Sequence, residues 1–169
     1  MVDEPQFADF VKNRAAALYR YGFMLTGNHH DADDLVQDAL IKLHAHWNRV
    51  VRKDDPTGYV RTTMARLNVS VWRRRQRELL TLQVPEQAGI DTALVRAEDH
   101  DYIVQIAASL QALPPRQRTV LVLRYYEQLS DEEIGAALGV SRGTVRSQAA
   151  RGLEKLRTAG IKELAGESA

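Results

Sequence analysis

Residues 130–157, SDEEIGAALGVSRGTVRSQAARGLEKLR, contain two short helical patterns on either side of a tight turn. Ser130, followed three residues later by Glu133, predicts a capping box at the start of the first helix. Gly139 supplies the turn, and Ser141 is placed to cap the second helix. This pairing of caps and turn predicts a helix-turn-helix, which limits the possible folds more than any other segment does.

The second helix of this segment is predicted to have one apolar and one basic side. At about 100° per residue, four apolar residues gather within about 80° of one another: Val145, Ala149, Leu153 and Leu156. Another side carries Arg146, Ser147, Ala150 and Arg151. Such a helix is typical of those that enter the major groove of DNA. The alternative is an ordinary helical hairpin with a solvated basic face.

Composition excludes several classes of site. The 169 residues allow one domain or two small ones, and 44% hydrophobic with 27% charged residues is ordinary for a soluble globular protein. The absence of cysteine excludes disulfides, thiolate metal sites and cysteine nucleophiles. No apolar run approaches the length of a membrane span, and the acidic start lacks the basic region of a signal peptide. We therefore expect a cytoplasmic protein without membrane insertion.

The net charge of +1 averages over blocks of opposite sign. Residues 61–77 contain six arginines and no acid, and residues 142–157 contain five basic residues against the single acid Glu154. The stretch between them is acidic around residues 86–101. Two separated basic helices indicate a polyanion that is contacted at two places. A solvated charged face is the alternative, although such faces normally mix the two signs.

Every periodic segment of the chain is helical, and none alternates like a strand. Helices are expected near residues 5–25, 31–48, 57–78, 99–112, 115–127, 130–138 and 141–159. Pro85 and Gly89 interrupt the periodicity, which indicates a linker. The predicted fold is all-α, with two small helical domains joined by this linker. The expected boundaries are a first domain at 1–80, a linker at 81–97, a second domain at 98–160 and a tail at 161–169.

The helix expected at 31–48 has an unusual polar face. Its core stripe is predicted to contain Ala32, Leu35, Val36, Ala39, Leu43 and Trp47. The opposite face carries Asp34, Gln37 and Asp38, with Ile41 among them. An isoleucine within an acidic face indicates a protein–protein contact with a small apolar centre and a charged rim. A scattered exposed apolar residue is the alternative, because such residues are common on soluble proteins.

The arginine-rich helix near residues 57–78 has the chemistry of a single-strand binder. Arginine grips phosphates with its planar fork, and an aromatic such as Trp72 can stack on an unpaired base. Asn68 offers both a donor and an acceptor, which suits the edge of a flipped-out base. The alternatives are a helix-interior hydrogen bond or plain exposure for Asn68 and a core position for Trp72.

The chain as a whole resembles an extracytoplasmic-function RNA polymerase sigma factor, the small class of the sigma-70 superfamily that keeps only regions 2 and 4. DADDLVQDALIKLHAHW (31–47) is similar to the region 2 helix that docks on the polymerase clamp. GYVRTTMARLNVSVWRRRQR (58–77) is similar to the part of region 2 that captures the −10 element. LQALPPRQRTVLVLRYYEQLSDEEIGAALGVSRGTVRSQAARGLEKLR (110–157) is similar to region 4, which binds the −35 element and the polymerase flap. FADFVKNRAAALYRYGFMLTGN at the start resembles the actinobacterial SigE-like subgroup.

This resemblance implies three binding surfaces and no cofactor or metal. The polymerase-binding residues would be Asp34, Gln37, Asp38 and Ile41. The residues at the −10 element would be Asn68, Trp72, Arg73, Arg74 and Arg75. The residues at the −35 element would be Arg142, Thr144, Arg146, Ser147 and Arg151. Trp72 departs from the family pattern, which usually has an acid or amide four residues after the asparagine.

The function expected from the resemblance is that of an alternative sigma factor, not an enzyme. Its partners would be core RNA polymerase and promoter DNA, and the resemblance leaves an anti-sigma factor open as a third. A second hypothesis is a stand-alone helix-turn-helix regulator that binds duplex DNA as a dimer and uses residues 1–80 for sensing or dimerisation. The basic helix at 61–77 argues against it, because a sensor domain has no need of one.

An enzyme or a metal site is the weakest of the hypotheses. Paired histidines stand at both ends of the helix expected at 31–48: His29, His30, His44 and His46. Residues one or two positions apart on a helix point to different faces, so these pairs cannot converge on one ion. The sequence contains no glycine-rich phosphate loop and no nucleophile motif.

Overall fold

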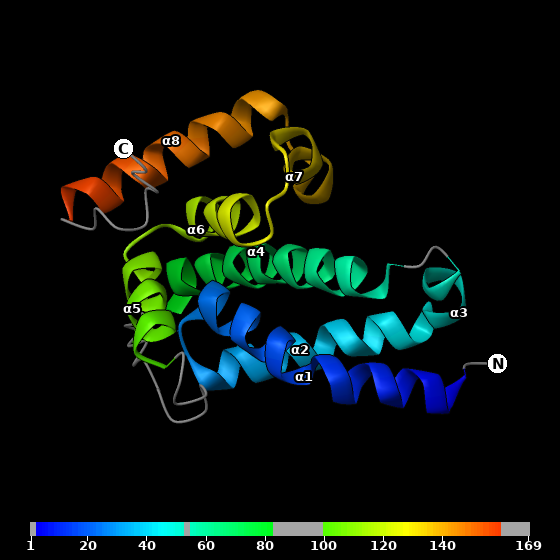
Figure 1. Ribbon diagram of the computed structural model, residues 1–169. Coiled ribbons are helices and arrows are strands. Elements are labelled where there is room, and N and C mark those ends of the chain that lie inside the picture. The colour runs from blue at the N-terminus through cyan, green and yellow to red at the C-terminus, as the bar shows by residue number, and fades with distance from the viewer. Residues whose placement is uncertain (1–2, 53–54, 83–99, 160–169) are drawn as a thin grey trace.

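The computed structural model describes residues 3–52, 55–82 and 100–159 of the chain (Figure 1). Over these ranges the protein is helical and contains no strand. The first module consists of α1 (Glu4–Thr26), α2 (His29–Ala45), α3 (Trp47–Val51) and α4 (Pro56–Leu82). The second consists of α5 (His100–Gln111), α6 (Pro115–Leu121), the π-helical turn η1 (Val122–Tyr126), α7 (Asp131–Leu138) and α8 (Arg142–Thr158). The all-α fold with two helical domains is confirmed.

The turn between α1 and α2 follows from two residues. α1 ends at Gly27, whose φ of 77° is a left-handed conformation that glycine adopts without strain. Asn28 then caps α2, because its side-chain oxygen accepts the backbone N–H of Asp31 at 2.8 Å. The two helices consequently return side by side, and the core stripe predicted for residues 31–48 is buried: Ala32, Leu35, Val36, Ala39, Leu43 and Trp47.

The helix expected at 31–48 differs from the observed one at both ends. The Asn28 cap starts α2 two residues earlier, at His29. The helix is interrupted at His46, and Trp47 begins the short α3. Trp47 is buried, and its indole meets Phe7 of α1 edge to face with ring centroids 5.3 Å apart. Trp47 thus keeps its predicted core position, although it belongs to α3 and not to the same helix as the rest of the stripe.

The helix-turn-helix is built as the sequence predicts. Ser130 and Glu133 form the reciprocal capping box at the start of α7. Gly139 ends α7 with a φ of 68°. Ser141 accepts the backbone N–H of Thr144 at 3.1 Å and thereby caps α8. The structure confirms each of these local predictions.

The segment expected as one helix at 115–127 changes its winding. α6 ends at Leu121, and η1 continues with π-helical turns, which fit an extra residue into the helix. The turn leaves two tyrosines on the surface, with Tyr125 51% and Tyr126 43% exposed. Gln128 follows in a left-handed conformation with a φ of 57°. Helical periodicity alone does not reveal an inserted residue of this kind.

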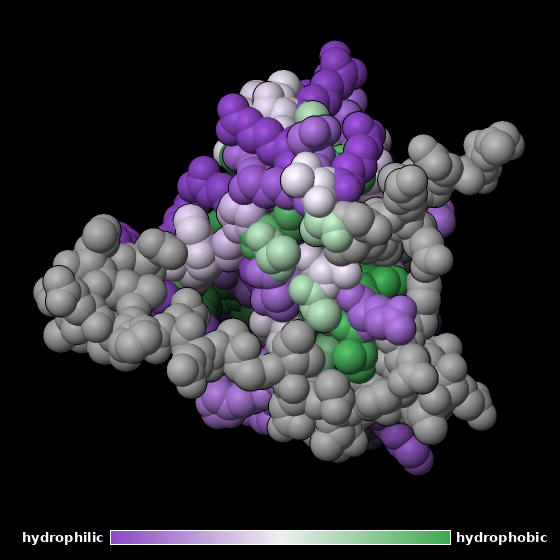
Figure 2. Space-filling view, turned by 90° about the vertical axis from the view of Figure 1, so that its left-hand side faces the viewer, coloured by the Kyte–Doolittle hydropathy of each residue, from purple (hydrophilic) through white to green (hydrophobic). Residues whose placement is uncertain are grey.

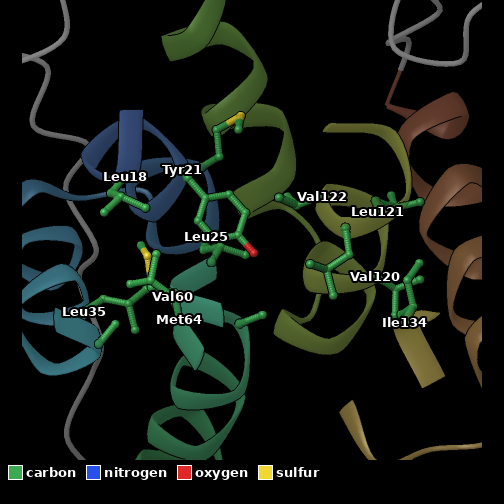
Figure 3. Close-up of a cluster of buried hydrophobic side chains, with 14 of the residues drawn as sticks. Leu18, Tyr21, Leu25, Leu35, Val60, Met64, Val120, Leu121, Val122 and Ile134 are labelled. Carbon is green, nitrogen blue, oxygen red and sulfur yellow. The ribbon is translucent and has the colours of Figure 1, made fainter. Parts of the chain in front are cut away.

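The two modules pack against each other rather than standing apart. α4 lies between the α1–α2 pair and α6, while α5 lies across the ends of the first-module helices (Figure 1). One buried cluster includes Leu18, Tyr21 and Leu25 of α1, Val60 and Met64 of α4, Val120 and Leu121 of α6, Val122 of η1, and Ile134 of α7 (Figure 3). The Tyr21 hydroxyl donates to the carbonyl of Arg61 at 3.2 Å, and burial strongly raises the pKa of Tyr21, which keeps the phenol neutral.

α4 runs through Leu82, so the first two residues of the predicted linker, 81–82, continue this helix. The other linker positions and the predicted tail at 161–169 lie outside the described residues. None of the helices that the structure describes is both long and apolar enough to cross a lipid bilayer.

Candidate nucleic-acid and polymerase interfaces

α8 separates a buried side from an exposed cationic side. Val145, Ala149 and Leu156 are buried, as predicted. Gly152 lies so close to α6 that a Cβ on it would come 2.9 Å from Cδ1 of Leu121. The outer side carries four of the five predicted −35 residues in exposed positions: Arg142, Arg146, Ser147 and Arg151. Hydrophilic side chains cover the upper part of the face in Figure 2, where the second module lies.

The fifth predicted −35 residue, Thr144, belongs to the cap of α8. Its hydroxyl lies 2.9 Å from the Ser141 hydroxyl, and its side chain is partly buried. Arg146 has a partner inside the motif, because its Nε lies 3.4 Å from a carboxylate oxygen of Asp131. Arg124 donates to the same oxygen at 2.9 Å. The Arg146 side chain nevertheless remains 63% exposed, so most of its surface is available to a ligand.

The predicted −10 arginines divide into two groups. Arg73 and Arg74 are exposed on α4. Arg75 forms a two-pronged contact in which Nη1 and Nη2 each donate to one carboxylate oxygen of Asp31, both at 3.0 Å. These hydrogen bonds hold the pKa of Asp31 below its ordinary value. The arginine cluster therefore stays at the surface, and one of its members also ties α4 to the start of α2.

Asn68 and Trp72, the predicted base-contacting pair, are partly buried rather than exposed. Both line a cavity of about 410 Å³ between α2, α4 and the second module, whose wall there includes Leu113 and Pro115. The Asn68 amide nitrogen Nδ2 is buried and has no hydrogen-bond partner. Buried polar groups are nearly always paired, so an amide left in this state is unusual.

The polar face of α2 is open. The predicted polymerase-binding residues are all exposed: Asp34, Gln37, Asp38 and Ile41. The Ile41 side chain is 68% exposed, more than Tyr125 or Tyr126. Gln37 donates to Asp33, one turn earlier on α2, at 3.2 Å. The observed face is thus an isoleucine surrounded by acidic and amide side chains, as predicted.

Three arginines outside the predicted site residues join the two modules, and two of them, Arg61 and Arg66, belong to the basic block that was expected to contact a polyanion. Arg66 of α4 donates to the carbonyls of Ala137 and Ala136 in α7, the latter at 3.2 Å. Arg118 of α6 is buried and donates to Leu25 of α1 at 2.6 Å. Arg61 of α4 contacts the ring of Tyr126 in η1 and the carboxylate of Glu127, the residue after η1. The arginines are visible in the sequence, but no sequence pattern shows which distant carbonyls they reach.

Three of the histidines near the ends of α2 have side-chain partners. His29 is buried and hydrogen-bonded to Tyr19, and His44 bonds to Glu4 at 2.8 Å. His30 lies 3.5 Å from Asp34, one turn along α2. Among the described residues there is no group of three or more histidine, cysteine, aspartate or glutamate side chains that could hold a metal ion.

Comparison with known proteins agrees with this architecture. The family described as "Sigma-70 region 2" matches residues 10–78, and "Sigma-70, region 4" matches residues 109–158. An RNA polymerase sigma-E factor of Streptomyces avermitilis is 37% identical over 153 residues, which cover 90% of this chain and 83% of the relative. The chain belongs to the extracytoplasmic-function sigma factors.

Two further similarities support the assignment of the chain to this family. The extracytoplasmic-function sigma factor SigE of Mycolicibacterium smegmatis is 37% identical, with 90% of this chain and 61% of that relative covered. The sigma factor RpoE from Bartonella quintana, solved in complex with the anti-sigma factor NepR, shares the fold with a TM-score of 0.69. That comparison covers 94% of this chain and 98% of the other at 24% identity. The resemblance inferred from the sequence, including its SigE-like character, is confirmed, and the protein is a transcription initiation factor.

Proposed function

We propose that this sigma factor binds core RNA polymerase through α2 and directs it to promoters by contacting DNA with α4 and α8. The observation that carries the proposal is the placement of two exposed cationic helix faces on separate modules. α4 presents Arg73 and Arg74, and α8 presents Arg142, Arg146 and Arg151. Two such surfaces suit a long polyanion that is contacted at two places.

α8 would read the −35 element as duplex DNA. Its buried side rests on α6, so its arginine side is free to enter a major groove. An arginine that reaches a guanine edge with two hydrogen bonds specifies sequence, whereas one that contacts phosphate adds affinity that decreases with salt. Arg142 at the first turn and Arg151 farther along α8 are exposed for these two kinds of contact.

α4 would hold one strand of the −10 element. Arg73 and Arg74 are available for phosphates, and Trp72 has the flat apolar surface on which an unpaired base stacks. Asn68 would hydrogen-bond the edge of that base through its buried, unpartnered amide. Arg75 would act mainly by fixing α4 to α2, because its fork is engaged by Asp31.

The polymerase contact would centre on Ile41. A side chain that is 68% exposed loses its contact with water when a partner covers it, and this burial favours binding. Asp34, Gln37 and Asp38 around it would supply the polar rim. The chain itself would catalyse no reaction and would act in the cytoplasm. An anti-sigma factor is the further partner implied by the family, and the Bartonella quintana protein is described as bound to one.

Reconstituted run-off transcription tests the function. Core polymerase with this chain and a promoter library should give transcripts from a subset of templates that share −10 and −35 motifs. Core polymerase alone should give none of them. A gel shift without polymerase is the control, because the free chain should bind promoter duplex weakly. Strong polymerase-independent binding to a two-fold site, without run-off transcripts, would favour the stand-alone regulator.

A further inference from the structure

Arg66 and Arg118 each cap a helix in the other module. The carbonyls of Ala136 and Ala137 lie in the last turn of α7, where they lack intrahelical partners, and Arg66 of α4 donates to both. The carbonyl of Leu25 lies in the last turn of α1, and Arg118 of α6 donates to it at 2.6 Å. A cation at a helix C-terminus also opposes the negative end of the helix dipole. Each module therefore supplies one arginine that caps a helix of the other module.

A third contact between the two modules involves Arg61. Its Nη1 lies 3.1 Å from both carboxylate oxygens of Glu127, the residue after η1. Its guanidinium carbon lies 5.9 Å from the ring centroid of Tyr21 and 6.0 Å from that of Tyr126. The two tyrosine rings are stacked at 6.1 Å, one from each module. The cation is thus held by an acid and two aromatic rings at the junction.

This closed arrangement does not fit simultaneous binding of two promoter elements. Elements named −10 and −35 are centred about 25 base pairs apart, which is about 85 Å along B-form DNA at about 3.4 Å per base pair. In the structure, α4 and the helix-turn-helix are within hydrogen-bonding distance of each other through Arg66. The two modules must separate before α4 and α8 can reach their respective elements.

The closed arrangement restricts access of DNA to the proposed −10 surface on α4 more than access to the proposed −35 surface on α8. The outer face of α8 is exposed, whereas Asn68 faces a cavity that the second module walls with Leu113, Pro115 and Arg118. The buried amide of Asn68 has no partner inside that cavity. A base could reach this amide more readily if the second module moved away from α4.

Open grooves lie on both sides of Arg66 where α4 meets α7. A groove of about 860 Å³ on one side is lined by residues that include Thr62 and Glu133. Another of about 270 Å³ on the other side is lined by residues that include Ser70 and Gly139. Arg66 therefore bonds to α7 at a solvent-open edge of the contact, in addition to the buried apolar cluster that includes residues of both modules.

We propose that Arg66 and Arg118 form a reciprocal capping latch, which keeps the free sigma factor closed and must open when polymerase and promoter bind. The proposal rests on the proposed function, because promoter spacing supplies the need to open. Arg61 strengthens the latch by holding η1 against α1. Arg66 is the member that can be tested most cleanly, because it is exposed, whereas Arg118 also supports its own module through the carbonyls of Leu110 and Leu113.

Single-molecule fluorescence transfer between two labels would measure the latch in the free protein. The chain has no cysteine, so Ala16→Cys on α1 and Lys155→Cys on α8 give two unique labelling sites, both exposed. Arg66→Ala should raise the population of low-transfer molecules about tenfold, since two charge-assisted hydrogen bonds are lost. Arg66→Lys, which keeps the charge but not the planar fork, should give an intermediate rise. Arg14→Ala, on the exposed side of α1, is the charge-matched control and should match the parent.

Equal transfer in the parent and in both Arg66 variants would overturn the latch, and circular dichroism would verify that each variant keeps its helices. Addition of core polymerase and promoter should shift the parent to low transfer. Retention of high transfer in an active complex would also overturn the latch.

The measurement on the free chain uses no polymerase, so failure of the latch can be distinguished from failure of the proposed function. If Arg66→Ala opens the free chain but the parent gives no run-off transcript, the function fails while the latch stands.

Discussion

Arg75 of α4 and Asp31 of α2 are joined by two hydrogen bonds of 3.0 Å, one from each terminal nitrogen to each carboxylate oxygen. This fork-to-fork geometry is the strongest arrangement for an arginine and a carboxylate. Asp31 also accepts a hydrogen bond from the side-chain amide of Asn28 at 2.9 Å, so the start of α2 and the C-terminal part of α4 form one polar network. Asp31 is therefore a structural residue at the edge of the proposed −10 surface.

Asp31→Asn should lower the free energy of unfolding by about 0.5–1 kcal/mol at neutral pH, a range set by the partial exposure of the pair. The pKa of Asp31 is lowered from 3.8, so the carboxylate stabilises the fold above about pH 4, and this stabilisation is lost as the pH falls through the lowered pKa. Urea unfolding of both proteins between pH 2 and 7 checks this. The difference between them should shrink at the acidic end; a constant difference would contradict the assignment.

Glu127 should have the opposite pH dependence. Burial raises its pKa above 4.5 despite the nearby Arg61, so its contribution to stability is greatest in acid and declines as the pH rises through the raised pKa. Glu127→Gln should therefore unfold with a free energy equal to the parent or up to about 1 kcal/mol higher at neutral pH. Arg61→Met, which leaves the carboxylate unpaired, should cost about 1–3 kcal/mol. Thermal unfolding of the two variants would distinguish them, and a larger loss for Glu127→Gln would reverse the interpretation.

Local patterns predicted the elements whose ends are set by neighbouring residues. The capping box at Ser130, the left-handed Gly139 and the buried stripe of α2 were all predictable because each depends on residues a few positions apart. The predicted exposure of Ile41 and Arg151 followed from the same helical geometry. These features need no knowledge of tertiary structure.

The contacts between modules could not be predicted in this way. Arg66 and Ala137 are 71 positions apart, and Arg118 and Leu25 are 93 apart. The sequence shows an arginine but not the carbonyl that it reaches. The same limit explains why Asn68 and Trp72, predicted to contact an unpaired base, line a cavity beside the second module.

Arg151→Ala should weaken binding of the polymerase complex to its −35 element by about 1–3 kcal/mol if the guanidinium contacts a base with two hydrogen bonds. Arg151 is exposed on the outer side of α8, so its removal leaves the fold intact. Equilibrium binding to cognate and −35-substituted promoters would measure the effect. Lys155→Ala, on the last turn of α8, is the matched control and should affect both promoters equally. Cognate transcription at the parent level would refute a base contact by Arg151.

Ile41→Asp should weaken binding to core polymerase by about tenfold or more, because it places a charge where an apolar side chain would be buried. The unfolding temperature should not change, since the Ile41 side chain is 68% exposed in the free protein. Fluorescence titration with core polymerase gives the affinity. Asn13→Asp on the exposed surface of α1 introduces the same charge elsewhere and should bind as the parent does. Parent-like affinity for Ile41→Asp would remove this residue from the interface.

Two glycines of the helix-turn-helix provide a matched comparison of packing. A Cβ on Gly135 would come 2.7 Å from the carbonyl oxygen of Val140, because the chain turns back across α7 there. That distance is shorter than a carbon–oxygen contact allows, and a backbone oxygen cannot move aside as the end of a side chain can. A Cβ on Gly143 would meet only the Ser141 hydroxyl at 3.8 Å. Gly135→Ala should therefore destabilise the fold by about 1–3 kcal/mol. Gly143→Ala, inside α8, should be neutral or stabilising by up to about 1 kcal/mol. Urea unfolding measures both variants. Equal stability of the two would mean that the turn between α7 and α8 adjusts to a side chain at Gly135, and the close approach of the two helices would then not depend on glycine.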